Sequence, residues 1–162
     1  MLIKGIIDCD LVNYKKPCLT IEMPKCNFKC DKECGMQVCQ NSNLASAPTI
    51  NIPRHKILSY YTSNPITKAL CFQGLEPFDT FDDMFKLIAD FRRTLWINDD
   101  IVIYTGYNEN EIQKEINKLR QFKNIIIKFG RFIPNQNSRY DEVLGVTLSS
   151  DNQYAEVINE EI

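Results

Sequence analysis

The spacing of the cysteines constrains this chain more than any other feature of its sequence. Four of the seven cysteines fall in one short polar stretch, at Cys26, Cys30, Cys34 and Cys39. The number is odd, and the first residues lack the layout of a secretory signal, so a disulfide framework is a poor interpretation. Thiols gathered in a polar loop instead favour metal binding or catalysis.

Length and charge narrow the class of protein. We expect the 162 residues to form one domain spanning positions 1–162, with the cysteine stretch 26–39 as a loop. Nineteen basic and 21 acidic residues leave no basic excess for binding a phosphate backbone. No apolar run reaches the length of a membrane span, and we expect a cytoplasmic protein.

Strand and helix patterns alternate along the chain. Four segments have the pattern of buried strands: 18–23, 69–73, 100–104 and 124–129. Three segments have helical spacing: 51–61, 79–91 and 108–119, the last opening with a capping box of Asn108 and Glu111. This order predicts an α/β fold with a mostly parallel sheet. Beyond position 131 the weak pattern predicts mostly loop, with one short strand near 144–148.

Ligands of parallel α/β sheets bind at the carboxyl ends of the strands. The loops at those ends are the segments 26–39, 74–77, 105–107 and 130–131. We expect all four loops to face one side of the sheet.

The cysteine stretch allows more than one metal. A structural zinc site uses four ligands, usually in C-x2-C or C-x4-C pairs, and four close cysteines could supply them. Cys26 and Cys30 form a C-x3-C pair, and thiolates also ligate iron–sulfur clusters. A cluster held by three cysteines would leave one iron open to another ligand.

Six short motifs occur in order along the chain: Cys9-Asp10-Leu11-Val12-Asn13, Cys26-Asn27-Phe28-Lys29-Cys30, Gly74-Leu75-Glu76-Pro77, Tyr104-Thr105-Gly106-Tyr107, Gly130-Arg131-Phe132 and Ser149-Ser150-Asp151-Asn152-Gln153. With these motifs the chain resembles the activating proteins of anaerobic, glycyl-radical ribonucleotide reductases, which belong to the radical S-adenosylmethionine superfamily. The resemblance covers nearly the whole chain in collinear order.

The chain departs from the family pattern at the third cluster cysteine. The family carries it two residues after the second, where this chain has Glu33. Cys34 comes one residue later, whereas Cys39 is followed by Asn41 and so resembles the family's Cys-X-Asn. We favour Cys39 and leave Cys34 as the alternative. Three other departures are Leu75 in place of a glycine, Phe129 in place of an aspartate and Lys25 in place of the glycine before the first cysteine.

The resemblance implies a partial (β/α) barrel of radical S-adenosylmethionine type. It implies one [4Fe-4S] cluster held by three of the four cysteines, with S-adenosylmethionine bound at the open iron. Reductive cleavage of S-adenosylmethionine would give a 5′-deoxyadenosyl radical that takes hydrogen from a glycine of an anaerobic ribonucleoside-triphosphate reductase. A flavodoxin- or ferredoxin-type protein would donate the electron. This chemistry belongs to the cofactor and requires no catalytic side chain.

The resemblance also implies that Gly74, Glu76, Thr105 and Lys128 bind the cofactor. Gly74 allows a close backbone approach. Glu76 either anchors the turn near the methionine amino group or caps the helix that follows. Thr105 and Tyr107 either contact the cofactor or shape the turn after a strand. Lys128 pairs with the methionine carboxylate if it points inward, and otherwise lies in solvent.

Two other functions are compatible with the sequence. One is a radical S-adenosylmethionine enzyme that acts on another protein or on a small molecule. The other is a zinc-binding interaction module without catalysis.

Overall fold

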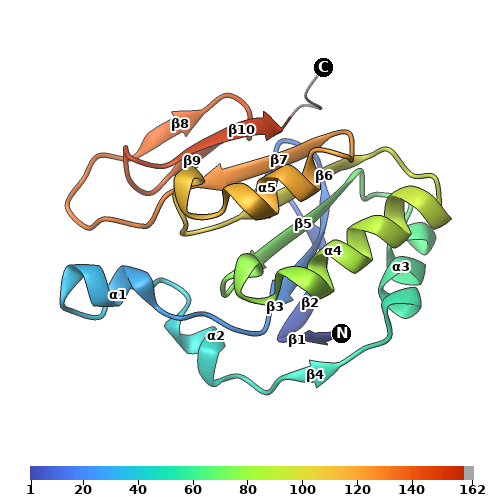
Figure 1. Cartoon of the computed structure of the whole chain (residues 1–162), viewed down its shortest axis with the longest axis horizontal. Coiled ribbons are helices and arrows are strands. Elements are labelled where there is room, and N and C mark those ends of the chain that lie inside the picture. The colour runs from blue at the N-terminus through green and yellow to red at the C-terminus, as the bar shows by residue number, and fades with distance from the viewer. Residues whose placement is uncertain (159–162) are drawn as a thin grey trace.

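A six-stranded mixed sheet organises the molecule (Figure 1). The computed structural model describes residues 1–158. In spatial order the strands are β10 (Tyr154–Ile158), β7 (Ile125–Phe129), β6 (Asp100–Tyr104), β5 (Ala69–Gly74), β3 (Cys18–Met23) and β2 (Gly5–Asp10). The four inner strands pair in parallel, and β2 and β10 add antiparallel edges. The inner strands are apolar along most of their length because both faces of the sheet are covered.

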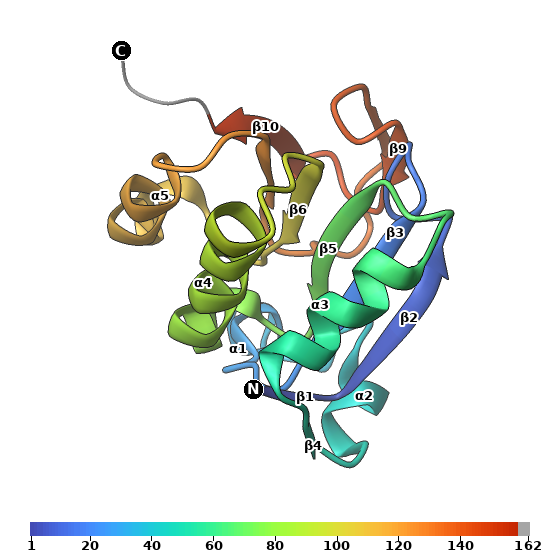
Figure 2. The same ribbon diagram turned by 90° about the vertical axis from the view of Figure 1, so that its right-hand side faces the viewer.

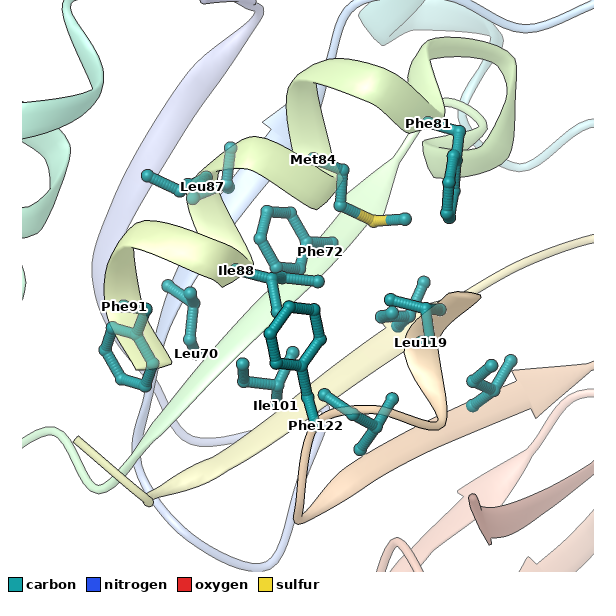
Figure 3. Close-up of a cluster of buried hydrophobic side chains, with 14 of the residues drawn as sticks. Leu70, Phe72, Phe81, Met84, Leu87, Ile88, Phe91, Ile101, Leu119 and Phe122 are labelled. Atoms are coloured by element: carbon teal, nitrogen blue, oxygen red, sulfur yellow. The ribbon is translucent and has the colours of Figure 1, made fainter. Parts of the chain in front are cut away.

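Three helices cover one face of the sheet: α3 (Arg54–Ser63), α4 (Phe81–Ala89) and α5 (Gln113–Leu119) (Figure 2). Figure 3 shows Met84 and Ile88 of α4 pointing toward Leu70 and Phe72 of β5. All four side chains are at most 1% exposed. Met84 and Ile88 are four residues apart and so lie on one face of α4, and the burial of this apolar face against the sheet holds α4 in place.

A small hairpin covers part of the opposite face. Its strands are β8 (Arg139–Asp141) and β9 (Val146–Leu148). Leu144 at the turn packs in a second apolar cluster with Cys71 and Val102. The backbone N–H of Lys15 donates to the Leu144 carbonyl at 2.8 Å, so the hairpin is joined to the β2–β3 connection.

Short elements complete the fold. They are β1 (Leu2–Ile3), which pairs with β4 (Ile50–Asn51), and the helices α1 (Lys29–Cys34) and α2 (Ser42–Ser46). Single turns of 3₁₀ helix at Pro77–Thr80 and Glu109–Glu111 precede α4 and α5, and a π-helical turn at Asp90–Thr94 follows α4. None of the described helices is both long and apolar enough to cross a bilayer.

The strands expected at 18–23, 69–73, 100–104 and 124–129 are confirmed as β3, β5, β6 and β7, within one residue at their ends. The capping box of Asn108 and Glu111 is confirmed as well. Two expectations are wrong. The tail contains β10, which completes the sheet, and the cysteine stretch contains α1 where we expected a loop. Strand β10 was missed because its pairing partner β7 lies far from it in the sequence.

Candidate metal centre and adjoining pocket

The loops at the carboxyl ends of the parallel strands enclose one pocket, as expected. Its volume is about 450 Å3. The lining brings together thiols and polar groups from all four loops: Cys26, Cys30, Cys39, Gly74, Glu76, Thr105, Gly106, Lys128 and Gly130. The four expected cofactor-binding residues therefore lie in one cavity with three of the four clustered cysteines.

Local structure separates Cys39 from Cys34. Cys34 ends α1, and it is not among the pocket-lining residues. The chain then turns at Gly35, whose φ of 67° is in the left-handed region. The Asp31 carboxylate accepts hydrogen bonds from the backbone N–H groups of Val38 and Cys39, both at 2.8 Å. These bonds bring the chain back, so that Cys39 lines the pocket.

Asn41 joins the segment that carries Cys39 to the turn at Gly74, on the other side of the pocket. Its side-chain amide donates to the Gly74 carbonyl at 2.7 Å. Gly74 has φ +90°, and a Cβ there would lie 2.7 Å from Leu44 Cδ2. The backbone conformation therefore favours glycine at this position, and a side chain here would also require Leu44 of α2 to move.

Burial favours the protonated form of two of the pocket thiols. It raises the pKa of Cys26 to about 11, and it also raises the pKa of Cys30. A metal offsets this cost, because thiolates ligate it in place of protons.

The three thiols of the pocket are suitable ligands for an iron–sulfur cluster. Among the described residues, no three His, Cys, Asp or Glu side chains are already arranged to bind a single metal ion. In a cubane, each thiolate binds a different iron, so sulfurs that surround a volume are suitable. Cys26, Cys30 and Cys39 could hold three of the four irons.

Glu76 is a buried polar anchor of the pocket. Its carboxylate accepts hydrogen bonds from Thr105 Oγ1 at 2.7 Å, the Gly106 N–H at 2.9 Å and the Phe78 N–H at 3.1 Å. The Phe78 contact caps the 3₁₀ turn that precedes α4, which agrees with the expected capping role, while the expected place of Glu76 near a methionine amino group stays a prediction. Burial raises its pKa to about 7, although the three hydrogen bonds act in the opposite direction.

Lys128 points into the pocket and is 7% exposed, so its interpretation as a solvated lysine is wrong. Burial lowers its pKa to about 8, while the charges of Glu76 and Cys30 favour the protonated form. Among the residues described, Nζ makes one hydrogen bond, to the Gly130 carbonyl at 2.9 Å. Two further ammonium donors can therefore bind an anionic group in the pocket.

Tyr107 lies outside the pocket, where it hydrogen-bonds to Asp79 and Asn27 instead of facing a cofactor. Its hydroxyl donates to Asp79 Oδ1 at 2.6 Å and accepts from Asn27 Nδ2 at 2.7 Å. Asp79 also accepts from the Asn27 N–H at 2.8 Å. The triad of Asn27, Asp79 and Tyr107 holds the start of the cysteine segment on the side away from the pocket. The sequence did not predict it because its members lie far apart in the chain.

A second network, also missed, surrounds Glu111. Its carboxylate receives Arg131 Nη2 at 2.6 and 2.7 Å and Lys29 Nζ at 2.8 Å. The Arg131 contact lowers the pKa of Glu111 to about 2. The sequence pattern predicted only the capping box at Glu111. The ion pair between Glu111 and Lys29 of α1 depends on tertiary structure.

Three thiols line a polar pocket at the carboxyl edge of the α/β sheet, which is an arrangement that can bind a metal cluster. The sequence model of one family, the 4Fe-4S single cluster domain, matches residues 18–154. The chain belongs to that family, and it is an iron–sulfur protein. No curated protein and no solved structure matches the chain.

Proposed function

We propose that this iron–sulfur protein is a radical S-adenosylmethionine enzyme, and that Cys26, Cys30 and Cys39 hold its cluster. The observation that carries the proposal is the shared pocket. Three thiols line the same cavity as Glu76 and Lys128, whereas Cys34 lies outside it. With three thiolate ligands, the cluster would occupy the part of this cavity of about 450 Å3 beside the thiols, and its fourth iron would face the part lined by Glu76 and Lys128.

The polar residues of the pocket suit the methionine end of S-adenosylmethionine. The buried ammonium of Lys128 has free donors for a carboxylate. The turn at Gly74 and Glu76 brings backbone groups to the pocket, where they can bind an amino group. Thr105 and Gly106 hold the Glu76 side chain in place, so the wall is formed before ligand binds. When bound, the reduced cluster would supply one electron to cleave the sulfonium and release a 5′-deoxyadenosyl radical.

The target is proposed from the six collinear motifs. They favour hydrogen abstraction from a glycine of an anaerobic ribonucleoside-triphosphate reductase, with a flavodoxin- or ferredoxin-type electron donor. The four parallel strands with helices on one face suit a partial (β/α) barrel of radical S-adenosylmethionine type. We extend the proposal to that fold type and to a cytoplasmic location.

Single cysteine variants test the cluster ligands. After anaerobic reconstitution, Cys39→Ser should lose the cluster, as measured by iron and sulfide content. Cys34→Ser is the matched control and should keep about four irons per chain, because its thiol lies outside the pocket. The reverse result for these two variants would contradict the ligand assignment.

Two further measurements test the reaction class. S-adenosylmethionine should change the electron paramagnetic resonance spectrum of the reduced wild-type cluster, and dithionite should yield 5′-deoxyadenosine. Incubation with the reductase should then produce a glycyl radical signal. An unchanged cluster spectrum with no 5′-deoxyadenosine rejects the radical enzyme, while cleavage without a glycyl radical rejects only the target.

A further inference from the structure

A buried guanidinium lies beside the cluster-binding thiols without taking part in the pocket. Arg131 is 6% exposed, although it follows β7 in a surface connection. Its Nη2 makes two contacts with the Glu111 carboxylate, at 2.6 and 2.7 Å. Its Nε lies 3.3 Å from Glu33 Oε1 of α1. The Glu111 carboxylate therefore holds the guanidinium through hydrogen bonds, whereas Nε makes no hydrogen bond to any described residue and is only within ion-pair distance of the exposed Glu33.

Arg131 is close to Cys30. If Gly106 carried a Cβ, that atom would lie 3.8 Å from both Arg131 Cγ and Cys30 Sγ. The two side chains therefore pack on the same glycine. The positive charge of Arg131 favours the thiolate of Cys30, and the backbone N–H of the neighbouring Phe132 acts in the same direction.

A carboxyl group also lies at this position, because the same Cβ on Gly106 would be 3.6 Å from Glu76 Oε2. The charge of Arg131 is therefore one of several that lie near the Cys30 side of the proposed cluster. Net charge and hydrogen bonds near the ligand sulfurs set the reduction potential of iron–sulfur clusters.

We propose that Arg131 is a positioning residue that acts through Cys30 to raise the reduction potential of the cluster. An electron added to the cluster is stabilised by a nearby cation in a low-dielectric environment. The hydrogen bonds to Glu111 hold the guanidinium in place, and the Arg131 stem packs with Cys30 on Gly106. This inference rests on ligation by Cys30, but it does not require S-adenosylmethionine to bind.

The test is a redox titration of the reconstituted cluster, followed by its visible absorbance. Arg131→Gln should shift the midpoint potential to a more negative value. Arg131→Lys keeps the charge and should remain closer to wild type. Arg93→Gln is the matched control, because Arg93 is an exposed arginine in the turn after α4. Its midpoint potential should equal that of wild type.

A midpoint potential in Arg131→Gln equal to that of wild type would overturn the proposal. Equal shifts in Arg131→Gln and Arg131→Lys would also overturn it, since the guanidinium's structural role would then explain both. If Arg131→Gln takes up no iron, the midpoint potential of the Glu33→Gln variant is measured instead. Removing that carboxylate leaves the guanidinium less compensated and should shift the potential to a more positive value, and no shift would reject the inference.

These results are separable from the proposed function. Loss of iron from Cys30→Ser tests the ligand on which both proposals depend. Formation of 5′-deoxyadenosine tests the radical enzyme alone. An unchanged potential in Arg131→Gln together with normal S-adenosylmethionine cleavage rejects the tuning role and leaves the enzyme intact.

Discussion

The buried carboxyl of Glu76 should make the stability of the iron-free protein depend on pH. Burial raises its pKa from 4.5 to about 7 on folding. Such a carboxyl stabilises the fold fully below its unfolded pKa, and the contribution is lost as pH rises through its folded pKa. At about 1.4 kcal/mol for each tenfold change in proton affinity, the loss amounts to about 3 kcal/mol.

The other groups with shifted pKa values in and beside the pocket change protonation outside the range between pH 4.5 and about 7. Lys128 has its pKa lowered to about 8, so it stays protonated between pH 4.5 and about 7 and adds no slope there. The pKa of Glu111 is lowered to about 2, so its contribution changes only at more acidic pH. The pKa values of the pocket thiols Cys26 and Cys30 are raised above 9.0, outside the window at the other end.

Glu76→Gln keeps the shape of the side chain and removes the proton. The unfolding free energy of the wild type should fall by about 3 kcal/mol across the window, whereas that of the variant should stay flat. Urea denaturation followed by far-ultraviolet circular dichroism is the suitable assay, since the single tryptophan, Trp96, is already 81% exposed when folded. Glu142→Gln, on the exposed turn of the hairpin, should keep the wild-type slope. Parallel pH curves for wild type and Glu76→Gln would refute the reasoning.

Two further substitutions test the walls of the pocket. Gly74→Ala forces a methyl group to within 2.7 Å of Leu44 Cδ2 at a φ of +90°, and it should cost about 1–3 kcal/mol in urea denaturation; wild-type stability would contradict this packing. Tyr107→Phe removes the 2.6 Å hydrogen bond to Asp79 and should cost about 2 kcal/mol. Amide exchange over 26–34 should become faster while β5 keeps its protection, and unchanged exchange in that segment would show that the triad does not hold it.

Local patterns in the sequence were sufficient for much of the fold. The apolar runs of β5, β6 and β7 are visible because a strand buried on both faces needs apolar side chains throughout. The stripe of α4 is visible because one helical face packs on the sheet. The convergence of the strand-end loops followed from parallel order alone, since carboxyl ends of parallel strands share one edge.

The distinction between Cys34 and Cys39 required tertiary structure. Both residues are cysteines in a polar stretch, and loop length alone does not separate them. The separation comes from the Asp31 hydrogen bonds to the chain at Cys39 and from the Asn41 bond to Gly74, 33 residues away. Contacts at such separations depend on how the two segments pack.

The sequence by itself therefore determined the four inner strands and the helices that cover them, because these follow from the periodicity of neighbouring residues, and their parallel order determined which end of the sheet carries the thiols. The tertiary structure decided where the polar side chains around the pocket point and which groups they contact. Lys128 is buried rather than solvated because its position on β7 faces the pocket. Arg131 is buried because its guanidinium pairs with Glu111, which lies 20 residues away in the chain. Such directions are set by register and packing between distant segments, and no local pattern encodes them.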